Sequence, residues 1–239
     1  MNINISGSGV IPAGEYEKIS TSGSAKLFGT VKCTAFSSSG SVKGESIECS
    51  EIIKTSGSAK FSGNVKAKSL STSGSFLCSD NISVSEKISC SGSFKCDESL
   101  KCNKLSQSGK LIVNGNIEAE SISASGKLIC RGLVNAGTLD AGCSRLNVNN
   151  IGGSKISITL GWFNRAIKKI PLISRLVRNA VIKNSVEGDE ISVEYIDCPR
   201  VIGKNVKIGF GCRIDLVEYT ESIEISRFAR IGKVQKIKL

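Results

Sequence analysis

Residues 55–71 read Thr-Ser-Gly-Ser-Ala-Lys-Phe-Ser-Gly-Asn-Val-Lys-Ala-Lys-Ser-Leu-Ser, and at residues 72–74 the chain begins the same pattern again with Thr-Ser-Gly. The Ser-Gly pair recurs at spacings of 17, 17, 17, 18, 17 and 17 residues. A fixed period of this length is typical of a solenoid in which each period forms one coil. The glycines of the series are Gly23, Gly40, Gly57, Gly74, Gly92, Gly109 and Gly126.

Apolar residues occupy the same places in each coil. They stand two, four, eight and thirteen residues after the glycine, as Ala59, Phe61, Val65 and Leu70 do after Gly57. A spacing of two is that of a β-strand with one buried face. Turn-forming residues between the strands let the chain bend, and stacked coils pair their backbones about 4.8 Å apart. The sequence therefore predicts an all-β fold, a parallel β-helix (β-solenoid) with ~17-residue coils over residues 1–155 and a helical insertion after it.

A shorter run of coils is expected over residues 187–239, where pairs of apolar residues recur after 15 and then 17 residues. The sequence leaves open whether these coils stack on the first run or form a smaller solenoid. The pairs are Ile191 and Val193, Val206 and Ile208, and Ile223 and Ile225.

Residues 156–186 do not follow the repeat, and we expect them to form a basic amphipathic helical insertion. They contain six basic residues and no acidic one, in a chain with a net charge of +11. Their apolar residues recur at helical spacing, and Pro171 should kink the helix. Such a segment either binds an anionic membrane surface or another partner, or docks on the solenoid. The residues predicted for membrane or partner contact are Trp162, Phe163, Arg165, Ile167, Lys168, Lys169, Ile170, Ile173, Arg175, Val177, Arg178, Val181 and Lys183.

Composition argues against most enzyme chemistry. The chain has no histidine, which excludes Ser-His-Asp and Cys-His catalysis and removes the usual general base of hexapeptide-repeat acyltransferases. No phosphate-loop motif is present, and neighbouring carboxylates such as Asp189 and Glu190 should point to opposite sides of a strand. We therefore expect a protein that is not an enzyme and has no cofactor, no small-molecule substrate and no nucleic-acid partner.

The ten cysteines are expected to be reduced and buried. None of them forms a Cys-x-x-Cys pair, which argues against zinc, and no secretory signal or membrane-spanning stretch is apparent. We predict a cytoplasmic protein without disulfides or bound metal, with the inner face of the cell membrane as a place of contact. Cys78, Cys96 and Cys130 should point inward four residues after the glycine, and Cys33 and Cys102 ten residues after it.

The Ser-Gly coils over residues 18–145 resemble those of the bactofilins, polymer-forming cytoskeletal proteins of bacteria. Residues 187–191 (Glu-Gly-Asp-Glu-Ile) and 208–219 (Ile-Gly-Phe-Gly-Cys-Arg-Ile-Asp-Leu-Val-Glu-Tyr) are similar to the C-terminal part of longer members. The resemblance implies a right-handed β-helix that polymerises end to end without nucleotide, into non-polar filaments that scaffold cell-shape or envelope machinery. This chain differs from the commoner pattern in the basic insertion that divides its coils.

A structural role is the leading functional expectation: a self-assembling cytoskeletal scaffold whose partner is a second copy of itself. The ends of a β-helix carry unpaired backbone groups that have to be capped or joined. The alternatives are a β-helix enzyme acting on sugars or acyl groups, which needs a cluster of acidic or basic side chains stacked along one outer face, and a membrane-surface binding module. The predicted polymer ends are Ile3, Ile5 and Val10 at one end and Ile231, Val234, Ile237 and Leu239 at the other.

Overall fold

The computed structural model describes residues 1–159 and 180–238. It is a parallel β-solenoid of about 13 turns with coils of about 17 residues, as the sequence predicts. The chain divides into two compact units, Met1–Ile117 (unit 1) and Glu118–Leu239 (unit 2). No helix occurs in the described residues.

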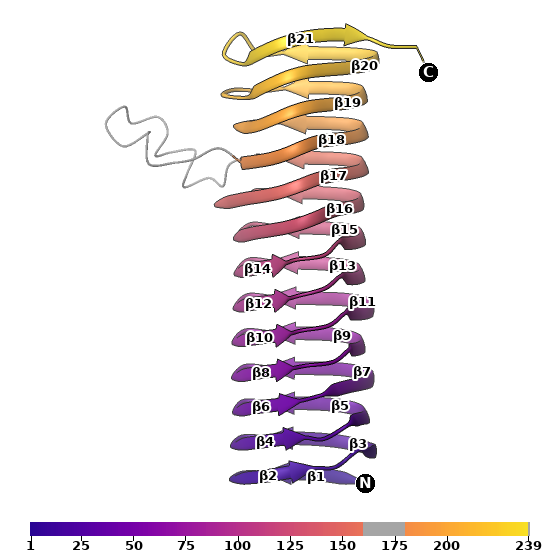
Figure 1. Cartoon of the computed structure of the whole chain (residues 1–239), viewed down its shortest axis with the longest axis vertical. Coiled ribbons are helices and arrows are strands. Elements are labelled where there is room, and N and C mark those ends of the chain that lie inside the picture. Colours follow the sequence, from indigo (N-terminus) through magenta and orange to yellow (C-terminus); the bar gives the residue numbers. More distant parts are fainter. Residues whose placement is uncertain (160–179, 239) are drawn as a thin grey trace, which may run out of the picture. The chain divides into compact units, whose positions relative to one another are not determined.

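Unit 1 alternates short strands with strands that are longer from β3 on, and Figure 1 shows the even-numbered strands in one rank and the odd-numbered strands in another. Each strand pairs in parallel with the strand one coil away. The short strands are β2 (Ser8–Ile11), β4 (Ser24–Leu27), β6 (Ser41–Gly44), β8 (Ser58–Phe61), β10 (Ser75–Cys78), β12 (Ser93–Cys96) and β14 (Lys110–Val113). The other rank is β1 (Asn2–Ile5), β3 (Gly14–Thr21), β5 (Thr30–Ser38), β7 (Ser46–Thr55), β9 (Val65–Thr72), β11 (Ile82–Cys90) and β13 (Leu100–Gln107).

Residues at the same position of successive coils pair in register and form columns that run across the strands. The four apolar positions predicted from the sequence are buried columns, as Ala59, Phe61, Val65 and Leu70 illustrate with exposures of 1% or less. Stacking continues along each column: the rings of Phe61 and Phe76 are 5.6 Å apart and those of Phe76 and Phe94 are 5.0 Å apart. The alternation of buried and exposed residues therefore builds one continuous apolar core within the unit.

Two irregularities of the repeat have physical explanations. The 18-residue coil accommodates its extra residue in a bulge between Val84 and Lys87, after which Ile88 returns to register with Leu70 and Leu105. Gly44 stands where the other coils have an apolar side chain. A Cβ atom at this residue would lie only 3.0 Å from the ring of Phe61, so the larger ring of the next coil fills the space.

The Ser-Gly corners stack their backbones closely. Ser58 donates its N–H to the carbonyl oxygen of Gly40 over 3.0 Å, and Ser75 donates to Gly57 over 2.9 Å. A Cβ atom added to Gly57 would lie 2.0 Å from the same oxygen of Gly40, and one added to Gly74 would lie 2.0 Å from that of Gly57. Neither glycine has a positive φ. Glycine is therefore required here by the approach of two coils, and not by an unusual backbone conformation.

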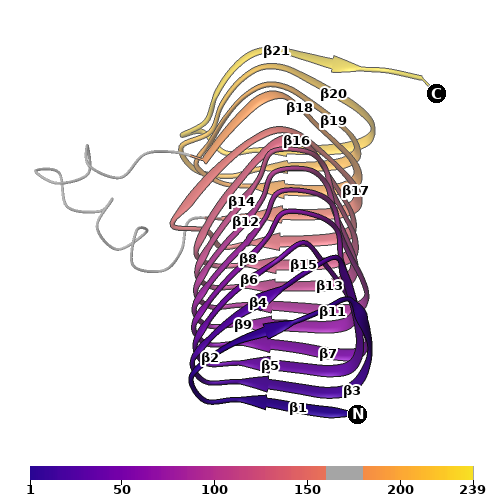
Figure 2. The same ribbon diagram turned by 60° about the horizontal axis from the view of Figure 1, so that its bottom comes forward.

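In unit 2, strands β16 to β20 are longer and turn corners without interruption, and each strand from β16 to β21 pairs in parallel with the next. Figure 2 shows these coils wound about a common axis. The strands are β15 (Ile117–Ala124), whose first residue belongs to unit 1, β16 (Lys127–Ala141), β17 (Arg145–Ile158), β18 (Ala180–Val193), β19 (Ile196–Ile208), β20 (Arg213–Ile225) and β21 (Arg230–Lys236).

The pairing of β17 with β18 answers a question that the sequence left open. Ile156 pairs with Ile191, which pairs with Val206, which in turn pairs with Ile223. Within unit 2, the coils before residue 160 and those after residue 179 are therefore parts of one stack. The apolar pairs predicted after residue 187 do lie in register.

The bounds predicted for the helical insertion, 156–186, are wrong at both edges. Residues 156–158 belong to β17 and residues 180–186 belong to β18. Helical spacing predicts Val181 on the apolar face of the insertion, but in the strand Ala180 and Ile182 are buried whereas Val181 is 38% exposed. Lys183 is exposed in the same strand. The other predicted contact residues, from Trp162 to Arg178, lie outside the described residues, as does Pro171.

Candidate interaction surfaces

The first strands of unit 1 and the last strand of unit 2 are paired on one side only, within the part of the chain that is described. In unit 1, β1 pairs with β3 and β2 pairs with β4. In unit 2, β21 pairs with β20, and none of its residues is buried. Each of these strands therefore presents backbone N–H and C=O groups that another strand could pair with.

Apolar side chains of the inward columns are uncovered at these ends. Ile3 and Ile5 in β1 are half-buried, as are Ile231 and Ile237 near the C-terminus, and Val234 is 43% exposed. Among the residues predicted for the polymer ends, Val10 differs. It is 62% exposed and pairs with Lys26 in an outward column, so it faces the side of the unit. Leu239 lies outside the described residues.

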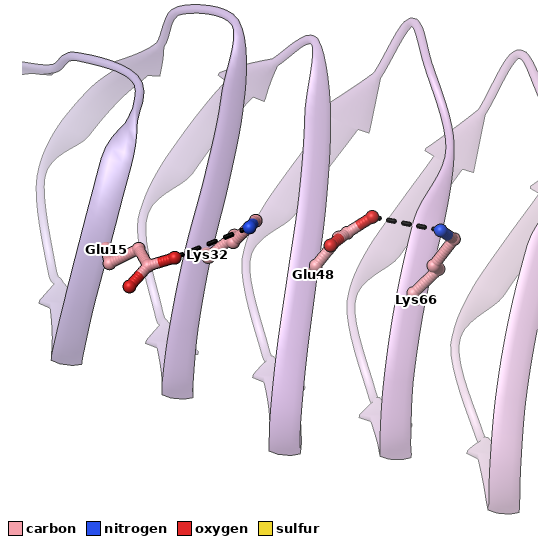
Figure 3. Close-up of polar contacts among 4 residues, drawn as sticks. All are labelled: Glu15, Lys32, Glu48 and Lys66. Atoms are coloured by element: carbon pink, nitrogen blue, oxygen red, sulfur yellow. Dashed lines mark hydrogen bonds and ion pairs between the residues drawn. The ribbon is translucent and has the colours of Figure 1, made fainter.

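An outward column of unit 1 alternates in charge. Glu15, Lys32, Glu48 and Lys66 are in register on successive coils, as Figure 3 shows. The ammonium of Lys32 lies 3.4 Å from the Glu15 carboxylate, and that of Lys66 lies 3.0 Å from Glu48. The opposite charges within this column neutralise one another, and each exposed ion pair contributes little to stability.

A second outward column of unit 1 is formed by lysines alone over three coils. Lys26, Lys43 and Lys60 pair in register on β4, β6 and β8, and all three are exposed. None of them has a carboxylate within 4.0 Å among the described residues. The ammonium of Lys26 lies 4.3 Å from the centre of the Phe28 ring.

All ten cysteines are buried and free, in agreement with the predicted inward positions. Burial raises the pKa of the Cys102 thiol to about 12 and that of Cys78 to about 11, which keeps both protonated at neutral pH. Cys33 and Cys49 are in register, with their Sγ atoms 2.7 Å apart. The hydrogen bond between them lowers the pKa of Cys33 and raises that of Cys49. Most of these thiols therefore behave as small apolar side chains.

Sequence reasoning missed a buried hydroxyl column next to the Ser-Gly corner. Thr21, Ser38, Thr55 and Thr72 are in register, each is at most 4% exposed, and their hydroxyl oxygens have no partner among the described residues. The signal was present, because the residue before each Ser-Gly pair in these coils carries a hydroxyl group. Burying a hydroxyl group without a hydrogen-bond partner costs folding free energy, so this column lowers the stability of the core of unit 1.

Unit 2 carries a row of aromatic rings that the sequence analysis also missed, in which Phe210 and Phe228 are exposed and Tyr195 is buried. The rings of Tyr195 and Phe210 are 5.5 Å apart and those of Phe210 and Phe228 are 4.8 Å apart. Arg227 lies over the Phe228 ring at 4.7 Å. Because Tyr195, Phe210 and Phe228 belong to three separate corners, only the three-dimensional register brings them together.

Within residues 1–159 and 180–238, no group of three or more Cys, Asp or Glu residues lies close enough together to hold a metal ion. No helix in the same part of the chain is long and apolar enough to span a membrane. Comparison with known proteins finds no family model, curated protein or solved structure that matches the chain. The functional argument therefore depends on the surfaces described above.

Proposed function

We propose that the protein is a self-assembling, non-enzymatic scaffold that polymerises end to end through its terminal coils, without nucleotide. The observation that carries the proposal is the pair of uncovered ends, β1 with β2 and β21, each hydrogen-bonded on one side only in the described structure. Stacking a second copy on either end extends the backbone pairing that holds every coil inside the units, in parallel where unlike ends meet and antiparallel where like ends meet. The absence of histidine from the sequence and the resemblance to bactofilins support the same role.

Uncovered apolar residues add to this argument. Joining two ends covers Ile3 and Ile5 on one copy and Ile231 and Val234 on another, and removes about 25 cal/mol of unfavourable free energy per Å² of apolar surface. The proposal includes a bacterial cytoskeletal role in the cytoplasm, where reducing conditions would keep ten free thiols reduced.

The experiment uses one substitution at two valines of similar exposure. Val234→Lys places a charge on the uncovered end, and Val181→Lys places the same charge on the outward face of β18. Negative-stain microscopy and sedimentation should show filaments for the wild type and for Val181→Lys, and short species for Val234→Lys. A wild type that is monomeric under all conditions would contradict the proposal.

Mixing end variants then reveals which ends meet. We would compare Val234→Lys, whose C-terminal end is blocked, with Ile3→Lys, whose N-terminal end is blocked. If like ends join, as in the non-polar filaments of the bactofilins, each variant alone forms dimers. If unlike ends join, each variant alone is monomeric and only the mixture forms dimers.

A further inference from the structure

One face of unit 1 repeats the same polar pair from coil to coil. Strands β4, β6, β8 and β12 each carry Ser-x-Lys, with the residue between them buried: Ser24 with Lys26, Ser41 with Lys43, Ser58 with Lys60, and Ser93 with Lys95. In β10 the serine is kept as Ser75 and Leu77 replaces the lysine. The serines and lysines form two parallel outward columns in register.

The lysine column carries positive charge that no carboxylate within residues 1–159 and 180–238 neutralises by an ion pair. Lys26, Lys43 and Lys60 are in neighbouring strands about 4.8 Å apart, where like charges directly opposite each other are unfavourable. Glu45, two residues after Lys43, makes no ion pair with it, and Asp97 pairs with Lys95 at 2.7 Å. An anionic ligand that spans several coils would relieve this repulsion.

The shape of the face favours a thread-like ligand over a flat one. A groove of about 430 Å³ is lined by the hydroxyl-bearing Ser8, Ser24 and Ser41 together with Lys26 and Lys43, across three coils. The serine side chains are short and the lysine side chains are long. A membrane surface would therefore meet the ammonium groups without reaching the hydroxyl groups, whereas a chain one residue wide reaches both.

The repeat and the chemistry of the face select among linear polyanions. An extended polypeptide places successive side chains of one face about 6.6 Å apart, which does not match a coil spacing of about 4.8 Å. Single-stranded nucleic acid requires aromatic platforms for its bases, and the ring of Phe28, beside this face, is already covered by Lys26. A polymer of uronic acids offers both a carboxylate and hydroxyl groups on each sugar.

We propose that the Ser-x-Lys face of unit 1 binds a linear acidic polysaccharide that lies along the stack of coils. Carboxylates of the sugar chain pair with Lys26, Lys43 and Lys60, and sugar hydroxyls exchange hydrogen bonds with Ser24, Ser41 and Ser58. Binding at this face uses the sides of the coils and not their ends, so it is independent of assembly.

The test measures binding of fluorescein-labelled polygalacturonate by fluorescence anisotropy at two salt concentrations. The test variant is Lys26→Gln, Lys43→Gln and Lys60→Gln together. The matched control is Lys32→Gln, Lys66→Gln and Lys101→Gln, which removes the same charge from the alternating column and from its continuation, where Lys66 is followed in register by Ser83 and Lys101. We expect wild-type binding that weakens with salt, a loss of about tenfold or more in the test variant and of about threefold or less in the control.

A third variant distinguishes the contribution of the serine hydroxyl groups to binding from the contribution of the lysine charge. Ser24→Ala, Ser41→Ala and Ser58→Ala keep every lysine and should weaken binding about threefold, because hydrogen bonds are lost. Circular dichroism verifies that each variant is folded, which is expected because all substituted residues are exposed. Four results would overturn the proposal: no binding by the wild type, equal loss in the two lysine variants, no loss in the serine variant, or tighter binding to phosphatidylserine vesicles or oligo(dT) than to polygalacturonate.

Discussion

In unit 1 the glycines that let neighbouring coils approach stand in Ser-Gly corners, whereas in unit 2 they stand inside long strands. Gly153, Gly188 and Gly203 form a column in β17, β18 and β19. A Cβ atom added to Gly153 would lie 2.0 Å from the carbonyl oxygen of Ala136, and one added to Gly188 would lie 2.4 Å from that of Gly153. At Gly203 the corresponding distance to the oxygen of Gly188 is 2.9 Å.

The comparison shows that glycine marks the place where two coils come closest, and not a particular type of turn. None of these glycines has a positive φ. In unit 1 the distance from the added Cβ atom to the carbonyl oxygen of the preceding coil is nearly the same at successive corners. In unit 2 this distance increases from Gly153 to Gly188 to Gly203. Substitutions in the two glycine columns should therefore have graded effects on stability.

The largest effect is expected at Gly57. In Gly57→Ala the new methyl group would lie 2.0 Å from the Gly40 oxygen and 2.4 Å from the Ser39 oxygen, both of which are backbone atoms. We expect a loss of at least about 3 kcal/mol in the free energy of unfolding of unit 1, measured by urea denaturation. The control is Gly7→Ala, at a corner with nothing within 4 Å of the added atom. An equal loss at both positions would refute the stacking explanation.

Gly188 and Gly203 of the unit 2 column should be less sensitive than Gly57. We expect Gly188→Ala to cost about 2 kcal/mol and Gly203→Ala about 1 kcal/mol, because the contacts of 2.4 Å and 2.9 Å require smaller shifts of the backbone. Hydrogen exchange read by mass spectrometry would locate the loss in unit 2. The prediction fails if Gly203→Ala is as damaging as Gly57→Ala.

Much of the core could be predicted from the pattern of apolar residues within one coil, but the strand at the edge of the predicted insertion could not. The columns of Ala59, Phe61, Val65 and Leu70 could be predicted because alternation within one coil decides which side chains point inward. Ala180 and Val181 could not be assigned to a strand from the sequence, because a short apolar run fits helical spacing as well as strand alternation. Only the pairing of β18 with β19 decides between the two.

The candidate surfaces were harder to predict than the core. The uncovered ends were anticipated from general properties of β-helices, although Val10 proved to face sideways. The repeat already contained the signal for the lysine column, because Lys26, Lys43 and Lys60 each stand three residues after the glycine of a Ser-Gly pair. Their pairing on β4, β6 and β8 shows that this position faces outward and that no described carboxylate pairs with them.

The buried thiols make the stability of the folded protein depend on pH. The pKa of Cys102 is raised by burial to about 12 and the usual thiol value is 9.0, so above pH 9 the unfolded chain loses a proton that the folded chain keeps. Stability should therefore fall as the pH rises, by about 1 kcal/mol per such thiol at pH 10. Cys102→Val should reduce this alkaline loss by about that amount, since Val84 occupies the same column. Urea denaturation at pH 8 and pH 10 would measure it, and an unchanged pH dependence would contradict the prediction.

The smallest effect is expected in the alternating charge column. Lys66→Gln removes the 3.0 Å ion pair with Glu48 and should change the free energy of unfolding by less than about 0.5 kcal/mol, because the lysine side chain is 61% exposed. The measurement is the urea midpoint at low and high salt. A loss above about 1 kcal/mol that salt abolishes would show that surface charge, as well as glycine stacking, holds the coils of unit 1 together.

The stacked corners also make the coils of unit 1 interchangeable. Ser41 and Ser58 bond to the glycine below them in the same way, so deletion of residues 41–57 would seat Ser58 on Gly23 and leave every column in register. Duplication of such a segment would lengthen the unit by one strand spacing of about 4.8 Å and keep its cross-section. The unit is in this sense a molecular ruler, whose length a gene can set in equal steps while each coil keeps its own surface chemistry.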